Sequence, residues 1–256
     1  MNRIQQLFKQ KDAHILSVYF TAGYPQLNDT LPVLEALQEN NIDLVEIGIP
    51  FSDPMADGLV IQESGHQALQ NGMNLRLLFE QLTDVRSRIH IPLVMMGYLN
   101  PILQFGFAEF CIECSRVGVD GMIIPDLPMD DYLSEYKAIA DKYDLKFIFL
   151  ITPETSEERI RIIDENTDGF IYMVSSAAVT GTQHSFISRE DYFKRVQSMN
   201  LKNPRLIGFG VSNKATLQMV NQFASGAIVG SAFIKTLRTA GSATEAVVKL
   251  LNQLSV

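Results

Sequence analysis

The stretch VEIGIPFSDPMADG, residues 45–58, joins an apolar run typical of a buried strand to a polar segment with two aspartates. Its first half is nearly continuously apolar, as a strand covered on both faces requires. Strands of that kind occur in parallel sheets flanked by helices. The stretch therefore predicts further units of the same type along the chain.

Eight short runs rich in Val, Ile, Leu, Phe and Met recur in the 256 residues. They span residues 15–23, 44–50, 92–98, 121–128, 146–153, 170–176, 205–211 and 227–233. Segments with helical periodicity separate them, and "RIQQLFKQ", residues 3–10, forms an additional amphipathic helix at the start. Eight strands alternating with eight helices predict an α/β fold, a closed (β/α)8 TIM barrel. We expect a single domain over residues 1–256, with the N-terminal helix against the barrel bottom.

The alternative fold is an open doubly wound sheet. That fold usually carries a GxGxxG fingerprint after its first strand, and "YFTAGYPQ", residues 19–26, lacks it. Two connections are long, namely residues 51–73 after the second strand and residues 177–187 after the sixth. In a barrel both leave from the carboxyl ends of the strands, so we expect them to be active-site loops.

Composition excludes several classes of protein. The net charge of −8 disfavours a nucleic-acid partner, because phosphate backbones are held by clustered Lys and Arg. No apolar run reaches the roughly 18–20 residues that span a bilayer, and the first residues lack a secretory signal pattern. We expect a cytoplasmic protein without a membrane partner.

The two cysteines form a CxxC in "EFCIECSRVG". Such spacing raises the question of a redox or zinc site, but no second pair or nearby histidine accompanies Cys111 and Cys114. At positions i and i+3 of a helix both would face the core, where free cysteines are common. The sequence favours structural cysteines and predicts no metal site.

The last two strands both end in turns that contain glycine. Gly208 and Gly210 follow the seventh strand, while Gly230 and Ser231 follow the eighth. Glycine lets the backbone approach an anion closely, and a following helix N-terminus offers free N–H groups. These turns, together with Gly181 after the sixth strand, predict a phosphate site.

Glu46 lies two residues inside the apolar run of the second strand. A carboxylate there is costly unless it is hydrogen-bonded or functional, and burial would raise its pKa toward that of a proton shuttle. Asp57 follows on the loop that leaves the strand. The first six strand ends contain no lysine, which disfavours Schiff-base chemistry, and the four histidines are scattered. A carboxylate is therefore the candidate general base.

These motifs resemble the tryptophan synthase alpha subunit family. The likeness extends from "VEIGIPFSDPMADG" over the whole chain, and the further matching motifs are "TAGYP" (21–25), "MGYLNPI" (96–102), "GVDGMIIPDLP" (118–128), "LITPET" (150–155), "VTGT" (179–182), "GFGVS" (208–212) and "IVGSA" (228–232). The resemblance implies a (β/α)8 lyase that cleaves indole-3-glycerol phosphate to indole and glyceraldehyde 3-phosphate without a cofactor of its own.

By motif position the resemblance makes Glu46 the proton shuttle, Asp57 the acceptor of the indole N–H, and Tyr172 a neighbour of Glu46 and the glycerol chain. The two carboxylates would be coupled in their ionisation. The resemblance further implies two groups of binding residues. The phosphate would be held by Gly181, Phe209, Gly210, Gly230 and Ser231, and the indole by Tyr19, Met96 and Ile123, with a weaker contribution from Tyr98.

The family's partner is a beta subunit that binds pyridoxal phosphate and condenses indole with serine, in an alpha2-beta2 heterotetramer. The resemblance implies that the loops 51–60 and 177–187 close over the substrate and touch this partner, with Asp53 and Thr180 coupling the two. Ser176 and Ala178 stand where many family members have arginine and glycine. These departures leave open a weakly catalytic alpha-like chain that mainly activates its partner. A separate alternative is another phosphate-binding barrel of the pathway, which would need a lysine or a general acid at other strand ends.

Overall fold

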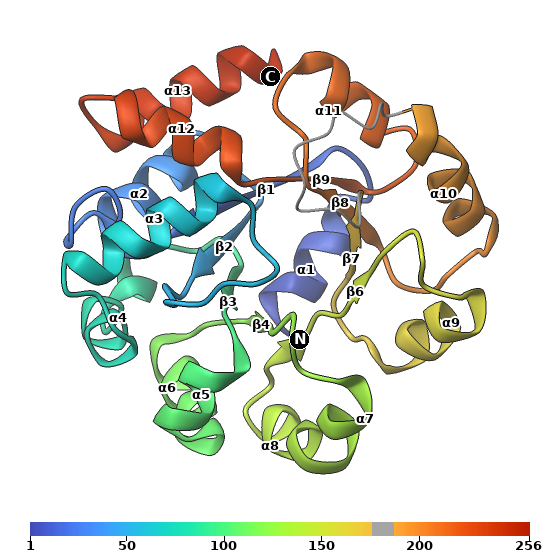
Figure 1. Cartoon of the computed structure of the whole chain (residues 1–256), viewed down its shortest axis with the longest axis horizontal. Coiled ribbons are helices and arrows are strands. Elements are labelled where there is room, and N and C mark those ends of the chain that lie inside the picture. Colours follow the sequence, from blue (N-terminus) through green and yellow to red (C-terminus); the bar gives the residue numbers. More distant parts are fainter. Residues whose placement is uncertain (176–186) are drawn as a thin grey trace.

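The structure is a computed structural model that describes residues 1–175 and 187–256, and it forms a ring of parallel strands surrounded by helices (Figure 1). Within those residues the sheet has nine strands, in the order β5-β4-β3-β2-β1-β9-β8-β7-β6. The strands are β1 (Ile15–Thr21), β2 (Leu44–Gly48), β3 (Leu93–Met96), β4 (Gly121–Ile123), β5 (Lys146–Phe147), β6 (Leu150–Ile151), β7 (Ile171–Val174), β8 (Arg205–Gly208) and β9 (Gly226–Val229).

The two ends of that order, β5 and β6, are consecutive in the chain and belong to one predicted strand, residues 146–153. Its first half pairs with β4 and its second half with β7. Between the halves, Ile148 N donates to Met122 O, and Tyr172 N donates to Phe149 O, each at 3.0 Å. Because one segment bonds to both neighbours, the sheet is closed. The TIM barrel is confirmed, and the open doubly wound sheet is wrong.

After α1, which lies at the centre of the view, helices follow the strands and cover the outside of the ring (Figure 1). Their bounds are α1 (Arg3–Gln10), α2 (Thr30–Glu39), α3 (Leu59–Gln70), α4 (Leu75–Gln81), η1 (Val85–Ser87), α5 (Leu99–Phe105), α6 (Phe107–Val117), α7 (Met129–Asp131), η2 (Tyr132–Tyr136), α8 (Lys137–Lys142), α9 (Glu157–Asn166), α10 (Ile187–Ser198), α11 (Lys214–Val220), α12 (Ser231–Thr239) and α13 (Ala243–Leu254).

The connection expected as one loop over residues 51–73 contains a helix, because α3 occupies Leu59–Gln70. The buried face of α3 consists of small residues, Ser64, Gly65 and Ala68. These let the helix approach β1 and α12 closely, but they give little of the apolar periodicity by which a helix is identified in a sequence. The loop after β2 is therefore shorter than predicted and ends at α3.

The predicted N-terminal helix closes the bottom of the barrel, as expected. Ile4 is fully buried and belongs to the cluster of side chains inside the ring, and the rings of Phe8 and Phe170 lie 5.9 Å apart. Asn2 caps the helix and also donates to the backbone oxygens of Asp120 and Asp144, at 2.8 and 2.9 Å. Apolar contact and these hydrogen bonds together fix α1 to the amino ends of the strands.

The strands are buried on both faces, which explains their continuous apolarity. All residues of β1, β2, β3 and β4 are buried. Alternate residues point inward, and the inward set forms a core of its own. Its members are Ile4, Ile15, Tyr19, Leu44, Val94, Met96, Ile123, Ile148, Phe170, Tyr172, Val174, Leu206 and Ile228.

Cys111 and Cys114 are free and buried on α6. Burial raises the pKa of both thiols, that of Cys111 to about 12, as the structural interpretation requires. Among the residues described here, no group of histidine, cysteine, aspartate and glutamate has the arrangement of a metal site. None of the described helices combines the length and apolarity needed to cross a bilayer.

Candidate active site

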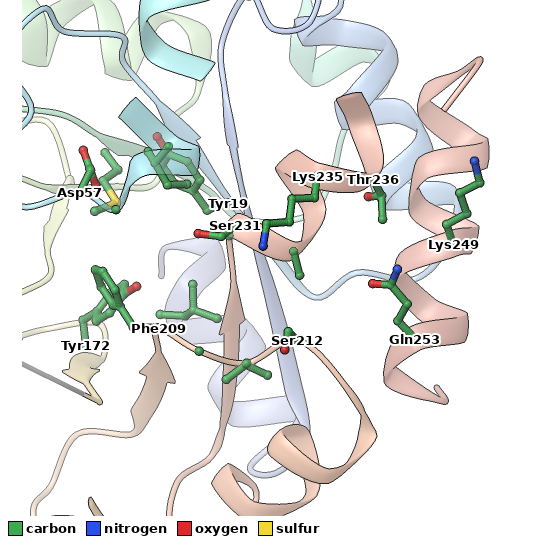
Figure 2. A pocket seen from close by; sticks show the side chains of 18 of the residues that line it. Tyr19, Asp57, Tyr172, Phe209, Ser212, Ser231, Lys235, Thr236, Lys249 and Gln253 are labelled. Atoms are coloured by element: carbon green, nitrogen blue, oxygen red, sulfur yellow. The ribbon is translucent and has the colours of Figure 1, made fainter. Parts of the chain in front are cut away.

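A cavity of about 680 Å³ lies at the carboxyl ends of the strands, and both halves of the chain contribute to its walls (Figure 2). Its volume lies within the usual range for small-molecule sites. Eight residues singled out from the sequence line it, namely Tyr19, Asp57, Met96, Tyr172, Phe209, Gly210, Gly230 and Ser231. The structure therefore brings together residues that are up to 212 positions apart in the chain, from Tyr19 to Ser231.

Glu46 lies in the middle of β2, between Tyr19 of β1 and Val94 of β3. Its side chain is fully buried, and the Ser17 hydroxyl donates to its Oε1 at 3.0 Å. Within the described residues its Oε2 has no hydrogen-bond partner. Burial raises the pKa of Glu46 to about 8, and the bond from Ser17 opposes this only in part. At neutral pH this carboxyl group carries a proton that it can donate.

Asp57 lies on the loop between β2 and α3, and its side chain faces the cavity (Figure 2). The Tyr98 hydroxyl donates to its Oδ2 at 2.9 Å and accepts from Ala56 N at 2.9 Å. The side chain of Gln62 donates to the backbone oxygen of Asp57 at 2.8 Å. Burial raises the pKa of Asp57, while the bond from Tyr98 stabilises the ionised form and opposes the rise.

Glu46 and Asp57 both raise the pKa values of two tyrosines, Tyr19 and Tyr172. Burial is the main cause that raises the pKa of Tyr172 well above its ordinary value, and the charges of Glu46 and then Asp57 add to it. The pKa of Tyr19 is raised by burial, by Asp57 and by Glu46. The expected coupling between the two carboxylates does not account for their raised pKa values. Burial is the largest cause of both shifts, and neither carboxylate contributes to the pKa shift of the other.

Tyr19 and Tyr172 have equivalent positions in the barrel. The Tyr19 hydroxyl lies against Gly48 at the end of β2, and the Tyr172 hydroxyl lies against Gly208 at the end of β8. A Cβ atom at either glycine would overlap the phenol. Both glycines are needed because they let a tyrosine from the preceding strand lean over the next strand toward the cavity.

The far end of the cavity is formed by the turns after β8 and β9. Phe209 and Gly210 have φ values of 67° and 80°, so two successive residues are left-handed. This conformation costs a phenylalanine about 1–2 kcal/mol, so surrounding structure must hold it. Ser175 contributes, because its hydroxyl donates to Phe209 O. After β9, Gly230 precedes α12 without a side-chain cap, which leaves N–H groups of the first turn available to an anion.

Known proteins with similar sequences and structures agree on one family. A sequence profile described as Tryptophan synthase alpha chain matches residues 5–255. The Tryptophan synthase alpha chain of Parabacteroides distasonis is 61% identical over 255 residues, which is 99% of this chain and 99% of that protein. The chain belongs to the tryptophan synthase alpha chain family.

Solved structures of tryptophan synthase alpha chains have the same fold. The crystal structure from Legionella pneumophila has a TM-score of 0.87 at 30% identity and covers 99% of this chain and 96% of that one. A mutant alpha-subunit from Pyrococcus furiosus has a TM-score of 0.85 at 37% identity and covers 96% and 99%. Tryptophan synthase alpha chains are lyases of tryptophan biosynthesis, and the reaction is the cleavage of indole-3-glycerol phosphate to indole and glyceraldehyde 3-phosphate.

Some residues expected for a tryptophan synthase alpha chain lie elsewhere. Ile123 and Glu46 are fully buried, and neither lines the cavity, whereas the tyrosines whose pKa values Glu46 raises, Tyr19 and Tyr172, do line it. Asp53 is exposed on the loop after β2, where its carboxylate contacts Ser52. Four residues singled out from the sequence lie outside the described residues, namely Ser176, Ala178, Thr180 and Gly181. Nearly all of the expected loop 177–187 lies outside them as well.

The sequence reasoning missed part of the cavity wall. The unpredicted polar residues are Ser212, Lys235, Thr236, Thr239, Lys249 and Gln253, most of them on α12 and α13. A signal for Lys235 was present, since it follows Ser231 by four residues on the same helix and therefore on the same face. Tyr98 was expected only as a weak indole contact, whereas it holds the Asp57 side chain.

Proposed function

We propose that Glu46 and Asp57 have different roles in the lyase reaction. Glu46 is the proton shuttle, and Asp57 binds the indole N–H. The single observation that carries this proposal is the contrast between the two environments. Burial raises both pKa values, but Glu46 is fully buried within β2 with a pKa raised to about 8, whereas Asp57 lines the cavity and the bond from Tyr98 opposes its rise. One group is suited to give a proton and the other to hold negative charge.

The reaction needs both functions in sequence. A proton added to C3 of the indole creates a cation that extends to the ring nitrogen, and the bond from C3 to the glycerol chain then breaks. The chain carbon becomes an aldehyde as its hydroxyl loses a proton. Protonated Glu46 would give the first proton and, as a carboxylate, take up the second, so it ends as it began. Ionised Asp57 would stabilise the charge at the ring nitrogen while it develops.

The remaining residues would bind the two ends of the substrate. Tyr172 would contact the glycerol chain beside Glu46, and Tyr19, Met96 and Ile123 would enclose the indole. The phosphate would accept hydrogen bonds from backbone N–H groups of Gly181, Phe209, Gly210, Gly230 and Ser231. The left-handed turn at Phe209 and the uncapped start of α12 support this assignment, because residues of both line the cavity and such backbone commonly binds anions.

The partner would be a beta subunit that holds pyridoxal phosphate and uses the indole, in an alpha2-beta2 assembly. Similar proteins are named alpha chain or alpha-subunit, which implies another type of subunit. Met55 and Leu59, at the end of the loop after β2, are 88% and 72% exposed. Large exposed apolar side chains beside a cavity suit a surface that a partner covers. In this proposal Asp53 and Thr180 couple the partner to the substrate, and this chain needs no cofactor of its own.

The test is release of indole from indole-3-glycerol phosphate by the purified chain and by Glu46→Gln and Asp57→Asn variants, with and without a beta subunit. We expect both variants to lose at least about a hundredfold in kcat, because general acid–base catalysis is worth about 10²–10⁴-fold and one electrostatic contact to the transition state about 10²–10³-fold. Met55→Ser serves as the control, since it should keep the basal rate and lose stimulation by the partner. A Glu46→Gln variant that retained most of the parent activity would contradict the assignment.

A further inference from the structure

The charged side chains that line the cavity must be compared with the negative charge of the phosphate that the cavity is proposed to hold. Three of the lining residues within the described parts of the chain are charged, namely Asp57, Lys235 and Lys249. Asp57 repels a phosphate. Lys249 is already engaged, because its Nζ lies 2.7 Å from the Glu245 carboxylate. Lys235 forms no ion pair with any described residue, so it is the one uncommitted cation of this wall in the described structure.

Lys235 is placed to reach the end of the cavity where the phosphate would lie. It follows Ser231, the first residue of α12, by four positions, so the two side chains share a face of the helix. Side chains of a helix lean toward its N-terminus. Figure 2 shows the Lys235 chain extending from α12 into the cavity, with its ammonium group on the side of Ser231 and Ser212.

We propose that Lys235 is a specificity-determining residue that neutralises the substrate phosphate together with the N-terminus of α12; this rests on the proposed function of the site. Backbone N–H groups supply hydrogen bonds and about half a unit of positive charge, but a phosphate dianion carries nearly two negative charges. The chain as a whole has a net charge of −8, which repels such an ion at longer range. An ammonium beside the helix terminus supplies the missing charge.

This role concerns only the phosphate end of the substrate and not the indole end. Lys235 would act on every ligand that carries a phosphate and would leave the affinity for indole alone unchanged. Asp57 lies away from Lys235 in the cavity (Figure 2), and Glu46 is buried within β2, so loss of the Lys235 ammonium should raise KM with little change in kcat. Lys235 is exposed at the rim of the cavity, and water therefore weakens its attraction to the phosphate. For this reason we expect about a tenfold rise in KM, which corresponds to about 1.4 kcal/mol.

The experiment compares the parent chain with Lys235→Met, Lys235→Arg and Lys214→Met. Lys214 starts α11, is exposed and does not line the cavity, so its variant makes the same change in net charge elsewhere. Indole release gives kcat and KM for indole-3-glycerol phosphate, and inorganic phosphate as a competing inhibitor gives an inhibition constant. Indole binding is measured separately by calorimetry.

For Lys235→Met we expect KM and the phosphate inhibition constant to rise together, with kcat and indole affinity near the parent values. Lys235→Arg should restore most of the affinity, and Lys214→Met should resemble the parent. Unchanged phosphate inhibition in Lys235→Met, or a fall in kcat at constant KM, would overturn the proposal. A parent chain without lyase activity would instead refute the proposed function, so the two failures are distinguishable.

Discussion

The burial of Glu46 makes a prediction about stability as well as about catalysis. Replacement by glutamine keeps the shape of the side chain and an oxygen that can accept the bond from Ser17, but it removes the ionisable group. Glu46→Gln therefore imitates the protonated form of Glu46 at every pH. The difference in free energy of unfolding between variant and parent measures what ionisation of this buried group costs the parent.

The size and the pH window follow from the pKa. Glu46 has a pKa of about 8 in the folded chain against a reference value of 4.5. Since the folded pKa is raised, the parent is fully stable relative to the variant below pH 4.5 and loses stability as pH rises toward 8. At about 1.36 kcal/mol per pKa unit, the variant should gain about 1 kcal/mol over the parent by pH 5, about 3 by pH 7 and about 5 above pH 8.

Urea-induced unfolding of parent and variant at pH 5, 6, 7, 8 and 9 checks this prediction. Other titrating groups cancel in the difference between the two proteins. Glu39→Gln is the matched control, because it makes the same change of side chain at an exposed position of α2. A constant difference for Glu46→Gln would show that its carboxylate is hydrated in the folded chain, and the reasoning about the proton shuttle would fail with it.

Three further predictions concern the supports of the site. Tyr98→Phe removes the bond that opposes the rise in the pKa of Asp57, so kcat/KM should fall about tenfold or more and the acid limb of its pH profile should move to higher pH; an unmoved limb would contradict this. Gly48→Ala forces a Cβ onto the Tyr19 phenol and should destabilise the chain by about 1–3 kcal/mol in urea unfolding with lower activity, whereas parent-like stability would show that the phenol moves aside freely. Asp120→Ala removes a buried carboxylate that pairs with half-buried Arg86 and accepts from Leu93 N at the barrel bottom. It should cost about 3 kcal/mol in unfolding while kcat stays near the parent value, and a lowered kcat would refute the separation of the two ends.

The fold was accessible from sequence because its signals are local. Each strand had to be apolar on both faces, and eight such runs between helices allow few arrangements. The features that the sequence did not predict are those that depend on contacts between distant segments or that lack a clear apolar periodicity. Residues 146–153 gave one apolar run, yet their hydrogen bonds divide between two neighbouring strands, and α3 was hidden because small side chains form its buried face.

The sequence by itself determined which residue types could do the chemistry: a carboxylate inside an apolar strand, an aspartate on the following loop, and glycine turns after the last strands. Only the tertiary structure decided how these residues act. Burial within the ring raises the pKa of Glu46, and Tyr98 at the start of α5 donates a hydrogen bond to Asp57. Lys235 reaches the cavity through the placement of α12. The physical reason is that hydrophobic periodicity is a property of neighbouring residues, whereas desolvation and charge act through space between segments that only the closed barrel brings together.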